Sequence, residues 1–282
     1  MAKANSLLSK SLQVAAGAVL LTFAGTTQAI TVDGDINDWL SAPQGQASDW
    51  GNILRSSISH VDEDQNSYYL DPGYGGQVYD VEAIFAEQMG TSLNIAIVTG
   101  RDPNASGWSG GDISFNFDFG TDATSFEFGI VTRDHDGMTQ GDVYAVSDWN
   151  YGIWTAPNVY NPSGSSLYKD SHPVNIQSGS LLGSVNLEYT DLLYNGSSPN
   201  QIGEFAGDHF MIETSLDLAM LGLVNLGLED DPYRIHWAPN CNNDWLQLDM
   251  PATHVPEPGA LLLLTIGLVG MAGRRRMSRK TK

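Results

Sequence analysis

Hydrophobic and polar residues alternate with a period of two through the middle of the chain. Residues 113–119 read ISFNFDF, in which Phe115, Phe117 and Phe119 alternate with small or polar residues. This alternation is typical of strands with one buried face and one face in water. Further stretches of strand character are residues 79–87, 93–97, 126–130, 142–147, 182–189, 209–214, 233–237 and 245–248.

Turn-forming residues separate these stretches, and almost no helical periodicity is present. Clusters of Gly, Pro, Asn and Asp lie between the strands. Residues 216–221 suggest one short helix, capped by Thr214 or Ser215. Several short strands without a long helix predict an all-β fold, a β-sandwich or jelly roll, over residues 30–250. Within it we expect residues 156–180 to form a long surface loop, because Pro, Gly, Ser and Asn are frequent there.

One strand carries a more specific expectation about its two faces. Residues 79–87, YDVEAIFAE, place Val81, Ala83 and Phe85 at alternate positions. A regular strand directs alternate side chains to the same face. We therefore expect these three side chains to share one buried face.

Charge is distributed very unevenly along the 282 residues. Residues 30–258 hold five of the 13 Lys+Arg and all 33 Asp+Glu, so five basic residues minus 33 acids leave a formal charge of −28 there. Such an acidic body repels nucleic acid and anionic lipid. We therefore expect no nucleic-acid partner, and the composition suits life outside the cell or the binding of divalent cations.

The N-terminal end resembles a secretory signal peptide, residues 1–29. Lys3 and Lys10 form a basic n-region, residues 14–25 form an apolar h-region, and the last residues before Ile30 suit cleavage after Ala29. The mature chain is then exported. Its single cysteine, Cys241, excludes an internal disulfide framework, and about 230 residues are enough to build a core without one.

The C-terminal end combines a short motif, an apolar run and a basic cluster. Val255, Pro256, Glu257 and Pro258 close a linker of residues 251–258. Residues 259–273 carry no charge and would span about 22 Å as a helix, against about 30 Å for a hydrocarbon core. Arg274, Arg275 and Arg276 then favour a transmembrane segment, residues 259–282, with its basic end in the cytoplasm.

This three-part tail resembles the PEP-CTERM sorting signal of Gram-negative bacteria that make exopolysaccharide. The resemblance implies an exosortase as processing partner and an inner-membrane intermediate held by the tail. It further implies removal of the tail near Pro256–Pro258 and delivery to the cell surface or extracellular matrix. In this reading the motif belongs to the protein as a substrate, and the alternative is an ordinary membrane anchor.

The body carries a second, shorter resemblance. Residues 31–39, TVDGDINDW, resemble the opening of family 9 carbohydrate-binding modules and of DOMON-type sandwiches. The resemblance implies a sandwich that binds sugar or haem. The aromatic pair that clamps sugar in true binding modules cannot be picked out, and neither can an axial Met/His pair, so the ligand rests on analogy of fold.

Four aromatic residues are candidates for stacking on glycans, because Gly, Asn or Pro residues lie beside them. An exposed aromatic ring can stack on the apolar face of a sugar. We expect loops to present these side chains: Trp108, Trp149, Tyr151 and Trp154.

Acidic side chains crowd one turn near the start of the body. Asp33, Asp35, Asn37 and Asp38 could supply several of the six to eight oxygen ligands that Ca²⁺ takes. The spacing does not complete an EF-hand loop, so capping of the turn is the alternative. A calcium site is a hypothesis here, and no other cofactor is indicated.

The sequence contains no specific catalytic motif. Residues 107–111, GWSGG, match G-x-S-x-G, but a nucleophile elbow needs a strand before it and a helix after it, whereas a strand is predicted to follow. The six histidines show no metal-binding spacing. We predict a non-enzymatic protein that binds to, or builds, an extracellular polysaccharide or biofilm matrix. The alternatives are a DOMON-like module and a secreted carbohydrate-active enzyme with a carboxylate pair such as Glu127 and Glu213.

Overall fold

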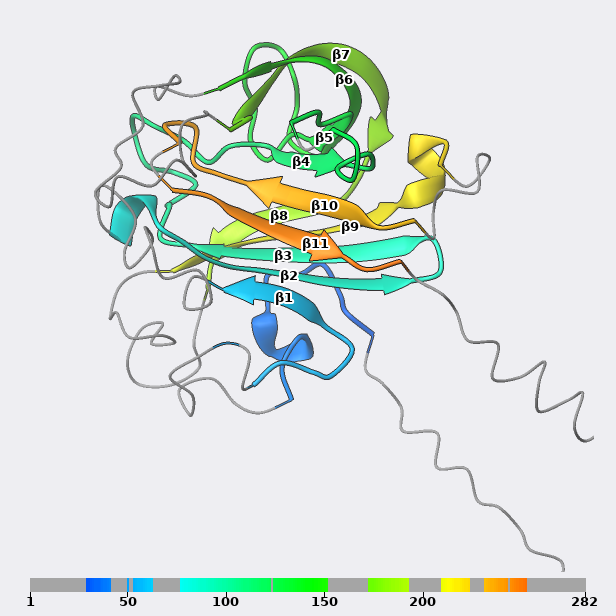
Figure 1. The fold of residues 1–282 in the computed structure, drawn as a ribbon. Helices are drawn as coiled ribbons and strands as arrows, with labels where there is room; N and C mark the ends of the chain where they lie inside the picture. The colour runs from blue at the N-terminus through cyan, green and yellow to red at the C-terminus, as the bar shows by residue number, and fades with distance from the viewer. Residues whose placement is uncertain are drawn as a thin grey trace, which may run out of the picture.

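The alternating segments form two antiparallel sheets in the computed structural model (Figure 1). The structure describes residues 29–41, 50, 53–62, 77–122, 124–151, 172–192, 209–223, 231–242 and 244–252. The first sheet has the order β1-β2-β3-β9-β8, formed by β1 (Ser59–Asp62), β2 (Val81–Met89), β3 (Ser92–Thr99), β9 (Phe210–Asp217) and β8 (Leu187–Asp191). The second has the order β11-β10-β4-β5-β6-β7, formed by β11 (Leu246–Met250), β10 (Tyr233–Trp237), β4 (Ile113–Asn116), β5 (Phe128–Ile130), β6 (Asp142–Asn150) and β7 (Asn175–Ser184). The predicted all-β fold is confirmed.

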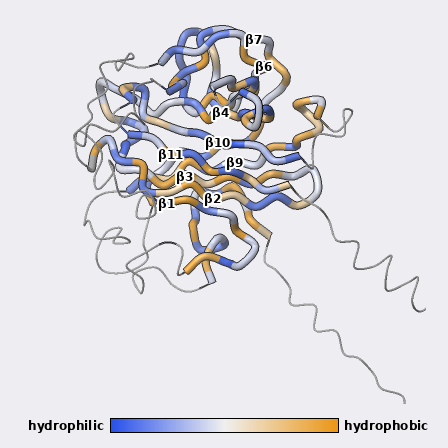
Figure 2. Tube along the Cα trace, in the orientation of Figure 1, coloured by the Kyte–Doolittle hydropathy of each residue, from blue (hydrophilic) through white to orange (hydrophobic). Residues whose placement is uncertain are grey.

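The main core lies between the two sheets. Ile95 and Ile212 from the first sheet pack in one buried cluster with Phe115, Ile235 and Trp237 from the second. Figure 2 shows the hydrophobic stretches concentrated in the strands at the centre of the molecule. Removal of these side chains from water on both sheets is the main force that holds the sandwich together.

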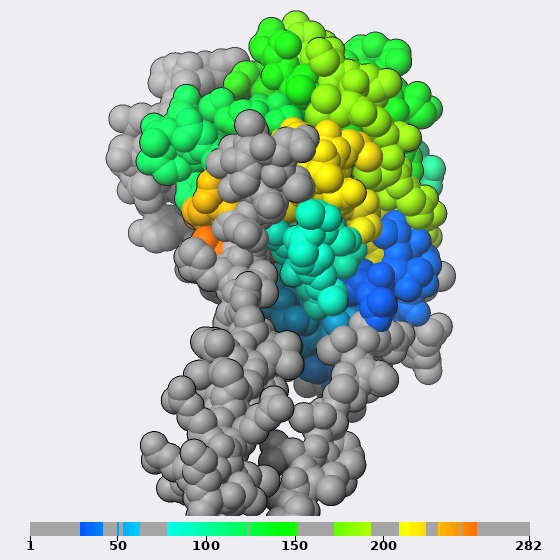
Figure 3. Space-filling view, turned by 90° about the vertical axis from the view of Figure 1, so that its right-hand side faces the viewer, coloured from blue at the N-terminus to red at the C-terminus, as the bar shows by residue number. Residues whose placement is uncertain are grey.

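The first sheet is buried on its other face as well. Ala83, Phe85 and Val98 pack there against the N-terminal segment, which contributes Ile36 and Trp39. Figure 3 shows this segment, in blue, lying beside the cyan turn between β2 and β3. The expectation that every strand has one face in water is therefore wrong for β2 and β3, because a third layer covers them.

A bulge changes which residues of β2 share a face. Val81 pairs with Thr99 and Ala83 with Val98, so the register shifts between Val81 and Ala83. The extra residue reverses the alternation: Val81 packs in the core between the sheets, whereas Ala83 and Phe85 face the N-terminal layer. The prediction that these three side chains share one face is wrong for this reason.

Three predicted elements are corrected in their limits. Part of the stretch expected to be loop, residues 156–180, lies in β7, and residues 152–171 lie outside the described part. The single strand expected over residues 182–189 is two, β7 and β8, which belong to different sheets. The short helix over residues 216–221 is a 3₁₀ turn, η6 (Leu218–Leu221), with Asp217 rather than Thr214 or Ser215 as its cap.

Both ends of the chain carry predictions that the structure does not describe. Residues 1–28 of the predicted signal peptide (residues 1–29) and the tail from residue 253 onward lie outside the described residues. Within the described residues, no helix has the length and apolar character needed to cross a bilayer.

Three chain segments cross at Gly111. Its N–H donates to the carbonyl of Ala238 at 3.0 Å, and the next N–H, of Asp112, donates to the carbonyl of Val174 at 2.7 Å. A Cβ atom at position 111 would lie closer than 3.0 Å to both carbonyl oxygens. Only glycine allows β4, β7 and the segment after β10 to meet here.

We expect Gly111→Ala to lower the free energy of unfolding by about 1–3 kcal/mol, because the backbone atoms it would strike cannot rotate away. Urea unfolding followed by tryptophan fluorescence measures this. Gly120→Ala is the matched control: position 120 has open space around its Cβ, and a change within about 0.5 kcal/mol is expected. Equal stability of the two variants would show that the crossing is not tightly packed.

Candidate functional site

The acidic turn near the N-terminus is held by hydrogen bonds to its own side chains. An Asp33 carboxylate oxygen accepts the N–H of Asp35 at 2.9 Å, and Asp35 accepts the N–H of Asn37 at 3.0 Å and so caps η1 (Ile36–Asp38). Asp38 accepts the N–H of Thr31 at 2.6 Å. Burial raises the pKa of Asp38, and the nearby charges of Asp33 and Asp35 add to this.

These contacts account for the acids as turn-forming residues. In the described ranges, no group of three or more His, Cys, Asp or Glu side chains is arranged to hold a metal ion. The calcium site at Asp33, Asp35, Asn37 and Asp38 stays a prediction.

A buried carboxylate fixes this turn to the first sheet. Glu213 lies in β9 and is fully buried. One of its oxygens accepts the indole N–H of Trp39 at 2.7 Å, and the other accepts the N–H groups of Asp33 and Gly34 at 3.0 and 2.8 Å. Burial raises the pKa of Glu213 to about 7, although these three hydrogen bonds oppose the shift. Sequence reasoning named Glu213 only as a catalytic example and missed this contact, since nothing local links it to residue 39.

The carboxylate pair suggested for a hydrolase does not line one groove. Glu213 lies in the first sheet beneath the N-terminal layer. Glu127 precedes β5 in the second sheet, and its carboxylate accepts the N–H of Phe117 at 2.9 Å. Both carboxylates are engaged in holding backbone in place.

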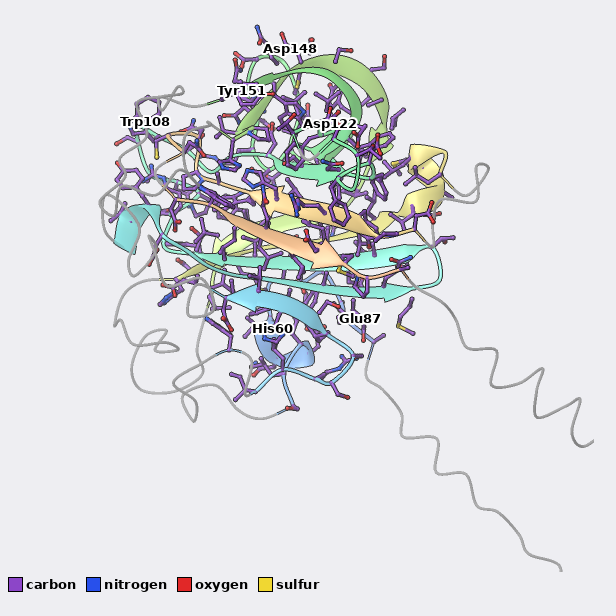
Figure 4. All side chains as sticks on the ribbon, viewed as in Figure 1. His60, Glu87, Trp108, Asp122, Asp148 and Tyr151 are labelled. Carbon is purple, nitrogen blue, oxygen red and sulfur yellow. The ribbon has the colours of Figure 1, made fainter. Side chains whose placement is uncertain are left out.

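Two candidate aromatic residues are exposed at one end of the sandwich. Trp108 and Tyr151 are each 42% exposed, and Figure 4 labels both in the upper left part of the view. Backbone hydrogen bonds place them at the same end: Val174 donates to Asn150, beside Tyr151, and accepts from Asp112, in the loop that carries Trp108. The sequence suggests both residues, but only the contacts of Val174 with Asn150 and Asp112 place them at the same end.

The other two candidates differ. Trp149 lies in β6, is 6% exposed and donates its indole N–H to the carbonyl of Phe126 at 2.8 Å. Its ring packs over Gly129, in a small cluster that covers part of the second sheet's outer face. The expectation that a loop presents Trp149 is wrong, because β6 continues past it. Trp154 lies outside the described residues.

The G-x-S-x-G stretch is a packed loop. Ser109 accepts a hydrogen bond from the side chain of Asn240 at 2.8 Å, and its carbonyl accepts the N–H of Asn240 at 2.9 Å. Gly110 lies against the rings of Tyr189 and Trp237. The segment continues into β4 and not into a helix, so Ser109 is not placed as a nucleophile.

Two buried carboxylates near this end were not singled out by sequence reasoning. Asp112 accepts hydrogen bonds from the N–H groups of Thr132 and Ile176, at 3.1 and 2.8 Å, and contacts the His135 ring at 2.8 Å. The hydrogen bond to Asp112 is the main reason that the pKa of His135 is raised. The partners of Asp112 lie 20 or more residues away in the chain, so no local pattern indicates this role.

Asp244 is the second of these carboxylates. It is fully buried and accepts the N–H groups of Val81 and Trp245, at 2.6 and 2.7 Å. Burial, followed by the charge of Asp80, raises the pKa of Asp244 well above its usual range. Asp244 therefore joins β2 to the β10–β11 connection, a structural role.

Comparison with known proteins gives one match. Residues 254–276 match the PEP-CTERM protein-sorting motif. The matched stretch contains the predicted Val255, Pro256, Glu257 and Pro258, the apolar run and Arg274 to Arg276, all outside the described residues. No curated protein and no solved structure matches the chain.

The match confirms the predicted sorting signal and supports export and surface sorting by an exosortase. The resemblance of residues 31–39 to family 9 carbohydrate-binding modules and DOMON sandwiches receives no such support. Cleavage after Ala29 stays a prediction.

The raised pKa of Glu213 predicts how stability depends on pH. The folded state holds the proton to about pH 7, whereas the unfolded chain releases it near 4.5. The native state therefore binds more protons between these values, and the free energy of unfolding falls as pH rises through this window, by up to about 3 kcal/mol. Glu213→Gln should flatten this part of the profile, measured by urea unfolding between about pH 4.5 and 8.

Glu188→Gln is the control. Glu188 lies opposite Glu213 on β8 but is exposed, so the pH profile of this variant should follow the wild type. Parallel profiles for Glu213→Gln and the wild type would contradict a protonated, buried Glu213.

Proposed function

We propose that this chain is a secreted protein, processed by an exosortase, that serves at the cell surface or in the extracellular matrix by binding or structure rather than by catalysis. The observation that carries the proposal is the PEP-CTERM match at residues 254–276. Such a tail needs no activity of its own, because it acts as the substrate of the processing enzyme. The inner membrane then holds the chain only until the tail is removed.

The body supports a role in a polysaccharide matrix in two ways. Its charge of −28 over residues 30–258 disfavours nucleic acid and anionic lipid as partners. Its exposed aromatic side chains at the loop end, Trp108 and Tyr151, offer apolar faces on which sugar rings can stack. A non-enzymatic role is consistent with the engagement of Glu127, Glu213 and Ser109 in structural hydrogen bonds.

The sorting part is tested in the producing host. Pro256→Ala with Pro258→Ala should block removal of the tail, since the extended motif is what a processing enzyme would hold. We expect intact mass and cell fractionation to give a wild-type form that runs from near Ile30 to near Glu257 outside the cell, and a variant retained in the membrane.

Pro251→Ala serves as the matched control, because Pro251 is an exposed proline at the start of the linker and outside the matched residues. It should leave processing unchanged. Wild type and double variant retained alike at full length would contradict exosortase processing.

The binding part is tested with polysaccharide extracted from the same host. Trp108→Ala and Tyr151→Ala should each weaken retention on immobilised polysaccharide by about fivefold or more, as loss of a stacking contact of about 1 kcal/mol implies. Met89→Ala is the control, because Met89 is 59% exposed at the end of β2. Retention of the wild type no stronger than that of an unrelated acidic protein would contradict a matrix-binding role.

A further inference from the structure

Basic side chains are rare in the body, and the structure shows how each described one is used. Two of them have carboxylate partners: Arg55 contacts Glu87 at 3.2 Å, and Arg234 contacts Asp249 at 2.6 Å. No ion pair to the other two is found among the residues that the structure describes, although acids outnumber bases more than sixfold over residues 30–258. The four described basic residues are Arg55, Arg101, Arg133 and Arg234.

Arg101 is a buried cation with little compensation. It is 1% exposed and follows β3 directly. Its guanidinium lies over the ring of Tyr79, 5.1 Å from the centroid, and donates to the carbonyl of Ser106 at 3.5 Å, the outer limit of a hydrogen bond. Its Nε has no acceptor among the described residues. A buried charge is costly unless an opposite charge or several hydrogen bonds offset it, so this site favours an anion nearby.

Arg133 lies in the same neighbourhood and is partly exposed. The preceding residue, Thr132, donates its hydroxyl to the carbonyl of Gly111 at 2.6 Å. The hydroxyl of Tyr189 donates to the carbonyl of Arg101 at 2.8 Å, and its ring contacts Gly110. The segment before Arg133 and the backbone of Arg101 therefore both lie close to Gly110 and Gly111. Burial raises the pKa of Tyr189, the charges of Arg101 and Arg133 oppose this, and the charge of Asp102 adds to it, as expected if all three charges lie close to the ring.

The acids beside these arginines are engaged elsewhere. Asp102 accepts the N–H of Asn104 at 2.6 Å, and Asp134 accepts the N–H of Gln140 at 2.8 Å. Asp136 contacts the His135 ring at 3.4 Å. No ion pair between these carboxylates and Arg133 is found among the described residues, so the partly exposed Arg133 can still pair with an anion from outside the chain.

We propose that Arg133 and Trp108, whose chain segments meet at Gly111 near the buried Arg101, form a site for a carboxylate-bearing sugar residue. Trp108 is exposed two residues before Gly110, so its ring can stack on the sugar while Arg133 pairs with the carboxylate. This inference rests on the proposed polysaccharide-binding function and names the class of sugar. The negative charge of the rest of the body repels polyanions at long range, but at physiological salt this field is screened beyond about 8 Å, and the local arginines decide close contact.

The test measures binding of two soluble probes to the full-length protein, kept in solution with a mild detergent. The probes are an oligomer of galacturonic acid and a neutral oligomer of galactose of the same length. We expect the acidic probe to bind more tightly than the neutral one, and Arg133→Gln to weaken it by about tenfold. Arg133→Lys should retain part of the affinity because it keeps the charge. Arg234→Gln is the matched control and should leave affinity unchanged, since Arg234 is already paired with Asp249.

The outcomes separate this inference from the function on which it rests. Equal binding of both probes, lost in Trp108→Ala but unchanged in Arg133→Gln, would keep the glycan-binding function and overturn the acidic-sugar site. Equal losses in Arg133→Gln and Arg234→Gln would also overturn it, because they would indicate a general charge effect. Binding of neither probe would overturn the acidic-sugar site, and with no retention on the host polysaccharide the glycan-binding role would fall too.

Discussion

The position of the N-terminal segment depends on one buried carboxylate, that of Glu213. The segment crosses the outer face of the first sheet, where its Ile36 and Trp39 cover Ala83 and Phe85. Apolar burial supplies most of the attraction, but it is not directional. The three hydrogen bonds that Glu213 accepts are directional, and they join the indole of Trp39 and the turn at Gly34 to the middle of β9.

This arrangement gives the opening motif of the body a physical meaning. The side chains of Asp33, Asp35 and Asp38 accept backbone N–H groups of the same segment and so shape the turn. The N–H groups of Asp33 and Gly34 donate instead to Glu213. Arg55 closes the segment from the other side by binding both the carbonyl of Asp38 and the carboxylate of Glu87 on β2. His60 in β1 and Glu87 in β2 are labelled in the lower part of Figure 4. Through these contacts the motif joins the N-terminal layer to the first sheet.

The end of the sandwich that carries Trp108 depends on the absence of side chains at two glycines. There the chain brings backbone segments very close at Gly110 and Gly111, and the short distance excludes any larger side chain. The tight crossing fixes a loop that carries the exposed Trp108, and Ser106 of the same loop accepts a hydrogen bond from the buried Arg101. Rigid presentation of a few polar and aromatic groups is what a binding surface needs, because less freedom is then lost when a ligand binds.

The sequence by itself determined the all-β class, most strand positions and the sorting tail, because period-two alternation and a local three-part motif depend only on neighbouring residues. It predicted β10 at its observed limits, residues 233–237. Only the tertiary structure decided that β2 and β3 are covered on both faces, that a bulge separates Val81 from Phe85, and that Trp149 is buried while Trp108 is not. Each of these depends on a contact between residues far apart in the chain, such as Trp39 with Glu213 or Gly129 with Trp149, and no local pattern records which distant segment will cover a given face.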